Sequence, residues 1–540
     1  MIRAIFNAVF FVIQHNKKHC PNKGSFTYFL PLFVKTSFMK ANLLFQSIYS
    51  IKVRVFFYAF CLLFEAYFTS SALAQSLVLS KPQRIANKVS EYEIAGKTDQ
   101  GVVLFKWGNN YNVVELYDER NLALIWSKEI QFDGRFKPQV RKLLAFKNDI
   151  LVFYTLKKKR TYYLYVRQTD TNMQPTNARD LLLDSLQTSF ASPLIGTDFA
   201  FSQNKAYLNV VFFAHEMNHI RHAKSILLNR NLETLSYRTI EVQGKEMLLQ
   251  NMVGNAGETI VAFADTRRTL LSNLPRYEYL RVETYDYKSR RTTQINIPNS
   301  DDHIGSLLFD IDNGNKQLVA AGFYTEQRNS RSIGFFYGKT AIGDTSIALR
   351  YVTFDTDLLQ QVNSNSVSTN GELFNLRLQQ LLVRQDGGAL LIGESVHTTQ
   401  QNTYRSAFDN FSRIPTPSTD YFYEDMVIIS VHPSGQTYWA KAVQKKQFSE
   451  DDNAYYSSFA ILNQKAGLRL IFNDEIRFNS KLSNCTVAAN GEHLMSSLNN
   501  YGTAQNMLLA PRYAKQLWAD ATLVPAFTSR NELVLVKILF

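Results

Sequence analysis

Residues 150–154 read ILVFY, a short run that is apolar at every position, and six comparable runs recur along the chain. They are VVLF (102–105), LNVVFF (208–213), IVAF (260–263), LVAAGF (318–323), ALLIG (389–393) and LRLIF (468–472). Each run is followed by a more polar strand-like segment, a tight turn and another strand-like segment, often with an aromatic residue. Self-similarity of this kind is typical of repeat architectures.

The runs carry hydrophobic side chains on both faces, so both faces of these strands must be covered. Parallel α/β sheets achieve this with helices, but helical periodicity is nearly absent after residue 85. Only residues 180–186 and 355–362 could each form a short helical turn. Propeller blades instead cover one another. The runs start 48 to 79 residues apart, more than the roughly 40–50 residues of a bare four-stranded blade. We therefore predict an all-β fold, a single β-propeller of seven blades with long loops, with six or eight blades left open.

The segment VHPSGQTYW at residues 431–439 is the clearest hairpin of the series. Its Gly435 and Trp439 resemble the G-x-x-x-W hairpin of PQQ-like propeller repeats, and residues 90–540 as a whole resemble secreted bacterial propellers of the PQQ-like or WD40-like type. The turns at Asn121 and Asn231 depart from that motif because they lack its glycine. The resemblance implies a fold and no quinone chemistry. We expect the aromatic rings after these turns, Trp126, Tyr237 and Trp439, to lie between neighbouring blades.

The last strand-like segment, residues 532–540, reaches the end of the sequence. Circular folds often close by pairing a terminal strand with the first blade, which removes an exposed sheet edge. We predict such a closure, with residues 89–95 as a candidate partner.

A targeting segment precedes the repeats. Lys52 and Arg54 stand before an apolar stretch at 55–64, and Ala72-Leu73-Ala74 follows, in the order of a secretory signal cleaved before Gln75. A membrane anchor is disfavoured because a span needs roughly 20 apolar residues. We interpret residues 1–38 as an atypical extension, 39–74 as the signal peptide, starting at Met39, and 75–540 as one propeller domain. The expected location is the periplasm or the exterior of a Gram-negative bacterium, with no stable membrane span after cleavage.

The net charge restricts the possible partners, and the cysteine content restricts how the fold is stabilised. Residues 1–74 hold eight Lys or Arg and one Glu, so without them the net charge falls from +13 to +6. The densest basic run, residues 157–160, lies between two strand-like segments, where a solvated hairpin tip is expected. A nucleic-acid site would need a concentrated basic stripe, so we expect no nucleic-acid partner. Cys485 is the lone cysteine after residue 74, and the fold must rely on its apolar core.

The pattern H-E-x-x-H occurs once, as His215-Glu216-Met217-Asn218-His219, with His222 nearby. On a helix the two histidines would bind zinc and the glutamate would act as general base, since positions i and i+4 share a helical face. Here a strand-like run precedes the motif, and the repeat places residues 214–221 in a loop between strands. We therefore assign no metal site and no catalytic residue, and keep His215, His219 and His222 as candidate zinc ligands.

Other polar and aromatic clusters can be explained by structural roles. Residues 310–315, DIDNGN, resemble a calcium loop but lack its later acids, and Asn-Gly between strands predicts a hairpin turn. Residues 450–452, EDD, would fit a solvated loop or a site for a cation. The aromatic residues at 421–423 and 455–456 lie beside polar loops, where they would anchor the core or form a sugar- or peptide-binding surface.

These features favour a secreted, non-enzymatic binding or scaffold propeller of the bacterial cell envelope. We expect a monomer without a cofactor, whose partner is a protein or glycan of the envelope. The alternative is a propeller enzyme acting on extracellular glycans or peptides, for which carboxylates roughly 5–10 Å apart at the central pocket would speak. A zinc peptidase acting through His215, Glu216 and His219 is the weakest alternative. The long loops at 397–423 and 444–456 are the expected places for function.

Overall fold

The computed structural model describes residues 76–540 apart from 86–88, 90, 109–110, 133–136, 189–192, 217–218, 268–275, 299–302, 326–330, 364–366, 369–370, 404–415, 466, 479–480 and 499–505. The chain divides into two units, Met1–Ala74 and Gln75–Phe540, and all described residues belong to the second. The expected extension (1–38) and signal peptide (39–74) lie outside the described residues.

The strands of the second unit form four-stranded antiparallel blades, numbered here along the chain. Blade 1 contains β3 (Glu91–Thr98), β4 (Gly101–Gly108), β5 (Tyr111–Tyr117) and β6 (Leu124–Glu129). Blade 2 contains β7 (Gln139–Lys147), β8 (Asp149–Lys158), β9 (Thr161–Asp170) and β10 (Leu181–Gln187). Blade 3 contains β11 (Leu194–Phe201), β12 (Tyr207–Glu216), β13 (His219–Asn229) and β14 (Thr234–Ile240). Blade 4 contains β15 (Met247–Val253), β16 (Thr259–Arg267), β17 (Arg276–Asp286) and β18 (Arg291–Pro298).

The second half continues the pattern with additions. Blade 5 contains β19 (His303–Asp312), β20 (Gln317–Thr325), β22 (Gly334–Ala341) and β23 (Leu349–Thr353). Blade 6 contains β25 (Leu376–Val383), β26 (Ala389–Thr403), β27 (Thr416–Val431) and β28 (Thr437–Val443), with β29 (Gln447–Glu450) added to β27. Blade 7 contains β30 (Ala460–Gln464), β31 (Gly467–Asn473), β32 (Leu482–Val487) and β33 (His493–Ser497). Blade 8 contains β34 (Met507–Leu509), β36 (Ala521–Thr528), β37 (Glu532–Leu539) and β1 (Ser76–Leu79), with β2 (Gln83–Arg84) on β37 and β35 (Lys515–Gln516) on β36.

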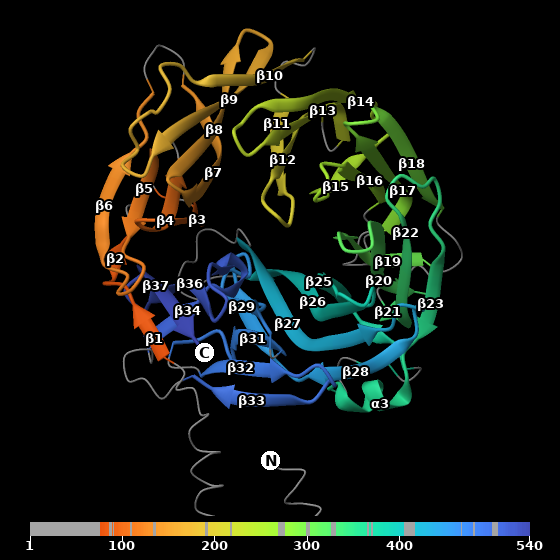
Figure 1. Cartoon of the computed structure of the whole chain (residues 1–540). Coiled ribbons are helices and arrows are strands. Elements are labelled where there is room, and N and C mark those ends of the chain that lie inside the picture. The colour runs from red at the N-terminus through yellow and green to blue at the C-terminus, as the bar shows by residue number, and fades with distance from the viewer. Residues whose placement is uncertain are drawn as a thin grey trace, which may run out of the picture. The chain divides into compact units, whose positions relative to one another are not determined.

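The connections add a two-stranded sheet, β21 (Arg331–Ser332) with β24 (Leu373–Phe374), and the helix α3 (Thr356–Gln361), and blade 8 contains a 3-10 helix, η3 (Pro511–Tyr513). The blades of residues 76–540 follow one another around a ring, with the first strand of each toward the middle and the last outside (Figure 1). The fold is therefore an all-β propeller, as the repeat predicts. The described residues form eight blades; the sequence favoured seven and left eight open.

The core is divided among the interfaces between blades. Each neighbouring pair of blades shares a cluster of buried hydrophobic side chains. The seven apolar runs are the second strands of blades 1 to 7, and in the run at 150–154 Ile150, Val152 and Phe153 are fully buried. Both faces of these strands are covered by neighbouring blades, which explains their unbroken apolar sequence.

A recurring hairpin turn explains the missing glycines of the motif. In the 432–436 turn the Gly435 N–H donates to the His432 carbonyl, and Gly435 has φ of +83°. In the 229–233 turn the N–H of Leu232 donates to the Asn229 carbonyl in the same pattern, and Leu232 has φ of +63°. Such a conformation costs a non-glycine residue roughly 1–2 kcal/mol. The turn geometry is thus conserved between blades where the glycine is not.

Of the three aromatic rings predicted to lie between neighbouring blades, two do so. Trp439 packs against the cluster shared by blades 6 and 7, and its Nε1 donates to the Ala489 carbonyl at 2.9 Å. Trp126 packs against the cluster of blades 1 and 2. The prediction is wrong for Tyr237, which is 58% exposed and lies beside Lys224, 5.2 Å from its ammonium nitrogen to the ring centroid. Tyr237 therefore belongs to the outer surface of blade 3.

The ring closes through the last strand, but with a different partner. β37 pairs antiparallel with β1, with Ser76 opposite Leu539, and with β2, with Gln83 opposite Leu533. Residues 91–95 are instead the beginning of β3, which pairs with β4 and β7. The closing blade thus combines both ends of the second unit.

Of the two expected helical turns, one forms. α3 begins after Asp355, whose Oδ1 accepts a hydrogen bond from the Leu358 N–H at 2.7 Å. Residues 180–186 instead form most of β10, because they pair with β9 from Leu181 opposite Val166. Cys485 is buried and unpaired, and burial raises the pKa of its thiol to about 11. No helix among the described residues has the length and apolar character of a membrane span.

Candidate functional site

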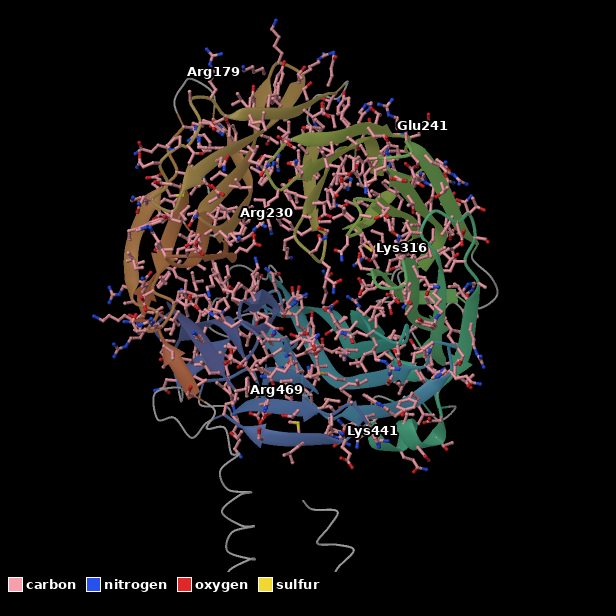
Figure 2. All side chains as sticks on the ribbon, viewed as in Figure 1. Arg179, Arg230, Glu241, Lys316, Lys441 and Arg469 are labelled. Atoms are coloured by element: carbon pink, nitrogen blue, oxygen red, sulfur yellow. The ribbon has the colours of Figure 1, made fainter. Side chains whose placement is uncertain are left out.

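A cavity of about 500 Å³ lies where the inner strands of blades 1, 2 and 3 end, beside β35 of blade 8. We call it the basic cavity. Five cationic side chains line it: Lys97, Lys142, Lys205, Arg230 and Lys515. Apolar walls come from Leu144, Phe146, Phe199, Phe201, Tyr207 and Leu517. Figure 2 shows Arg230 on the inner side of the ring. The volume lies in the range of small-molecule sites, roughly 300–1,000 Å³.

A close approach of two inner strands shapes this cavity. β3 and β7 pair in parallel, with Gly96 opposite Ala145. Gly96 has φ of +152°, and a Cβ atom there would lie 2.1 Å from the Ala145 carbonyl oxygen. Only glycine allows such a contact. The pairing brings Lys97 of β3 and Lys142 of β7 onto the same cavity.

Two of the five cations are paired with carboxylates. The Lys97 ammonium lies 2.6 Å from Glu119 Oε1, and Trp518 Nε1 donates to the same carboxylate. Lys142 forms an ion pair with Glu93. These pairs hold the two lysines in place and neutralise their charge.

The other three cations have different surroundings. Lys515 Nζ donates to the carbonyl oxygens of Ile94 at 3.2 Å and Ala95 at 3.1 Å. Lys205 Nζ lies 5.2 Å from the centroid of the Phe201 ring. Burial lowers the pKa of both lysines, and for Lys515 the nearby charges of Lys142 and Lys205 lower it further while Glu93 opposes them. Within the described residues, Lys205, Arg230 and Lys515 form no ion pair.

A second cavity of about 350 Å³ adjoins the first and shares Lys142 and Phe199 with it. We call it the mixed cavity, because Glu93 and Asp198 line it together with Lys142 and Arg141. Burial raises the pKa of Asp198, against a hydrogen bond from Asn251 and the charge of Lys142. A carboxyl group with a raised pKa keeps its proton to higher pH.

The H-E-x-x-H motif lies at a hairpin tip. β12 ends at Glu216 and β13 begins at His219, with Glu216 opposite His219 and His215 opposite Ile220. Residues on opposite strands that face each other share a side, and successive residues alternate, so His215 and His219 leave opposite faces of the hairpin. Glu216 is held by Arg221, with Arg221 Nε 3.0 Å from its Oε2. This is not the helical arrangement that a zinc peptidase needs.

His215 lines a third, smaller cavity of about 250 Å³ together with Asp198 and Phe213. Burial lowers the pKa of His215, and the charge of His219 lowers it further. His222 lies opposite Ala214 on β13. Among the residues that the structure describes, no group of three or more His, Cys, Asp or Glu side chains is arranged to hold a metal ion.

The other polar clusters are structural turns. Asp312 ends β19, and its carboxylate accepts hydrogen bonds from the backbone N–H of Asn315 at 2.9 Å and from its side-chain amide at 2.7 Å. The turn predicted at 310–315 is therefore confirmed. Residues 157–160 are exposed at the β8–β9 hairpin, as expected for a basic tip. Asp452 accepts from Ser449 Oγ at 2.7 Å and from the Ala454 N–H at 2.8 Å, so it stabilises its own loop.

The loop aromatics serve the core. The Tyr455 ring packs on Tyr92, Tyr513 and Phe527, with ring centroids 4.8–5.8 Å apart, at the interface of blades 8 and 1. Phe422 stacks on His397 across β26 and β27 at 4.4 Å. In the 397–423 segment, residues 404–415 lie outside the described part of the chain. Core anchoring, one of the two roles left open by the sequence, is thus seen for Tyr455.

Sequence reasoning missed the basic cavity. Its cations come from β3, β7, the turn before β12, the β13–β14 turn and β35, and they span residues 97 to 515. No common motif or spacing in the sequence links these five residues. The one local signal is Gly96, a glycine inside a strand, which often indicates a close backbone approach.

Comparisons with known proteins found similar solved structures and no related sequence. No protein-family model matches the chain, and no curated protein does. Among solved structures, the WD40 domain of SCAP from fission yeast is 7% identical, with a TM-score of 0.38, over 86% of this chain and 98% of that one. An uncharacterized protein of Listeria monocytogenes is 10% identical, with a TM-score of 0.34, over 75% and 96%. The Nup133 β-propeller domain of Vanderwaltozyma polyspora is 9% identical, with a TM-score of 0.35, over 75% and 100%.

Proposed function

We propose that this chain is a secreted binding propeller of a Gram-negative cell envelope, and that its ligand enters the basic cavity. The signal pattern of residues 39–74 motivates the location. The basic cavity carries the binding proposal: it combines apolar walls with five cations that come from four different blades. Concave sites with apolar walls and a few convergent polar groups are the usual form of ligand sites. The ligand is a small molecule or a group on an envelope protein or glycan.

The retention of a ligand tests this function. Ala206 lines the basic cavity and is half-buried, so Ala206→Trp is expected to fill part of it. Residues 75–540 would be incubated with an envelope extract and repurified, and small molecules or glycans released by denaturation would be identified by mass spectrometry. We expect a defined ligand on the parent protein and at least tenfold less on Ala206→Trp, because the indole occupies the ligand volume.

The control is Ala341→Trp, at an exposed end of β22 away from the cavity lining. It should retain as much ligand as the parent protein. A parent protein that releases no ligand, or equal retention by Ala206→Trp, would contradict the binding function.

A second function rests on Asp198. The mixed cavity holds two carboxyl groups, Glu93 and Asp198, and burial raises the pKa of Asp198. Glycoside hydrolysis uses such a pair, with the protonated member as general acid. A propeller enzyme acting on extracellular glycans would therefore use Asp198 as the acid. The zinc peptidase has no comparable support, because His215 and His219 leave opposite faces of their hairpin.

The enzyme alternative predicts that Asp198→Asn lowers glycan turnover at least 100-fold, since an amide cannot donate the proton, and that the exposed Asp99→Asn does not. Reducing-end release from a panel of bacterial and plant polysaccharides would measure it. Absence of turnover by the parent protein, or equal turnover by Asp198→Asn, would eliminate this function.

A further inference from the structure

The basic cavity holds more positive charge than its neighbouring carboxylates neutralise. Lys97 and Lys142 have carboxylate partners. Lys205, Arg230 and Lys515 have none among the described residues, although all three line the same space of about 500 Å³. Like charges brought together on low-dielectric walls repel one another. An anion in the cavity would relieve that repulsion.

The ammonium group of Lys515 can donate a hydrogen bond into the cavity. Its ammonium group has three N–H donors, and two are used by the carbonyl oxygens of Ile94 and Ala95. The third remains for a group inside the cavity. The Lys205 ammonium contacts the face of the Phe201 ring and makes no side-chain hydrogen bond within the described residues. Burial lowers the pKa of both lysines, and the charges of Lys142 and Lys205 lower that of Lys515 further, against the opposing charge of Glu93.

Most of the remaining lining is apolar, and Asn229 and Gln516 add neutral polar groups. Leu144, Phe146, Phe199 and Leu517 face the same cavity, which has no carboxylate among its lining residues. A fully hydrated ion would gain nothing from these walls, whereas an apolar body would, at about 25 cal/mol for each Å² removed from water. A ligand that matches this cavity therefore needs a charged group for the cations and an apolar surface for the walls.

We propose that the basic cavity binds an amphiphilic anion, a single anionic head group on an aliphatic or aromatic body. The head group lies between Lys205 and Lys515, with Arg230 at the exposed side, and the body lies against Phe146, Phe199 and Leu517. This inference rests on the proposed binding function and names the chemical class of its ligand.

Calorimetric titration of residues 75–540 with three probes tests the class. Decanoate has both features, decanamide has the same chain without charge, and glucuronate has the charge without the apolar chain. We expect decanoate to bind at least tenfold more tightly than either, because a charge-assisted hydrogen bond is worth about 1.5–3 kcal/mol and tenfold corresponds to about 1.4 kcal/mol. Added salt should weaken decanoate binding and leave decanamide binding unchanged.

Charge-removing variants locate the head group. Lys205→Gln with Lys515→Gln should reduce decanoate affinity to that of decanamide, while Lys441→Gln, half-buried on β28 of blade 6, should change neither. If the double variant does not fold, Lys205→Gln alone serves, since Lys205 lies in the turn before β12 and its side chain makes no hydrogen bond or ion pair among the described residues; it should weaken decanoate binding at least threefold.

The outcomes separate this inference from the function on which it rests. Decanoate binding equal to that of decanamide, or equal to that of glucuronate, or unaffected by the lysine variants, would overturn the amphiphilic anion. If a ligand is nevertheless retained from the envelope extract and lost in Ala206→Trp, the binding function stands. If the parent protein and Ala206→Trp retain equal amounts of ligand, the binding function itself is contradicted.

Discussion

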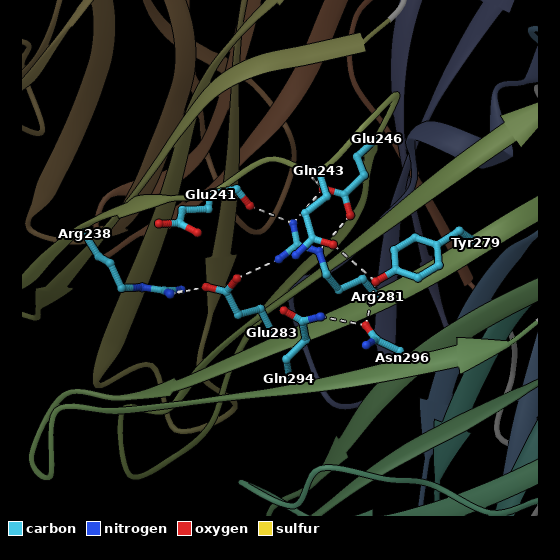
Figure 3. Close-up of polar contacts among 9 residues, drawn as sticks. All are labelled: Arg238, Glu241, Gln243, Glu246, Tyr279, Arg281, Glu283, Gln294 and Asn296. Atoms are coloured by element: carbon cyan, nitrogen blue, oxygen red, sulfur yellow. Dashed lines mark hydrogen bonds and ion pairs between the residues drawn. The ribbon is translucent and has the colours of Figure 1, made fainter.

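Replacing Arg281 by methionine is expected to lower the free energy of unfolding by about 3–5 kcal/mol, the usual result of removing one partner from a buried ion pair. Arg281 is 1% exposed, and Glu246 beside it is also 1% exposed. Arg281 Nε and Nη2 donate to the two oxygens of Glu246 at 2.7 and 2.6 Å, and Nη1 donates to Glu283 at 2.7 Å (Figure 3). The variant would leave both carboxylates buried without their shared cation.

The network of Arg281 also joins two blades. Arg281 and Glu283 lie on β17 of blade 4, whereas Glu246 lies in the connection between blades 3 and 4. Arg238 of β14 in blade 3 pairs with Glu283 from the other side, and Arg281 Nη2 donates to the Glu241 carbonyl at 3.0 Å. The loss should therefore weaken an interface that ring closure depends on.

Urea denaturation followed by circular dichroism would measure the change. Arg291→Met is the matched control, because Arg291 is exposed on β18, and it should change stability by less than about 0.5 kcal/mol. A double variant, Arg281→Met with Glu246→Gln, should recover part of the loss, because Glu246 then carries no buried charge and Glu283 keeps Arg238 as its cation. A loss below about 1 kcal/mol for Arg281→Met would contradict a structural role of this network.

The repeat and its hairpins were predictable because their physical requirement is local. A strand covered on both sides must be apolar on both sides, and the run at 150–154 meets this directly. Likewise, Gly435, which supplies the positive φ of a turn, and Trp439, whose ring packs between blades, lie within the same nine-residue segment. Seven such runs predicted seven blades. The second strand of blade 8 is β36, which contains Pro525 opposite Leu535. A proline inside an apolar run argues against a strand, so the sequence pattern did not indicate an eighth blade.

The site could not be predicted because it depends on pairings between distant segments. Lys97 and Lys515 come together only when the ring has closed. The same reason explains the wrong closure partner: residues 76–79 are a short strand, and the sequence alone does not show that they, instead of residues 89–95, pair with the last strand. Local pattern indicates which segments become strands, while the choice of neighbour depends on the packed ring.

Removing residues 75–85 is expected to cost on the order of 5–10 kcal/mol, from several half-buried hydrophobic residues at about 1–2 kcal/mol each and several hydrogen bonds at about 1 kcal/mol each. β1 and β2 together cover the outer edge of β37. Leu77 and Leu79 pack on the blade 7–8 cluster, and Val78 and Ile85 on the blade 8–1 cluster. Because whole domains are stable by only about 5–15 kcal/mol, we expect the ring to open at blade 8.

The opened ring should show this as a separate, early unfolding transition, and hydrogen exchange should be fastest in β36 and β37. Lys81→Ala, an exposed change between β1 and β2 that keeps both strands, is the control and should unfold in one step like the parent protein. A synthetic peptide of residues 75–85 should restore the single transition, since an added strand can complete an open sheet edge. If the shortened chain unfolded like the parent protein, β34, β36 and β37 would be sufficient to hold blade 8, and the pairing of the two ends would be a consequence of ring formation that adds little to its stability.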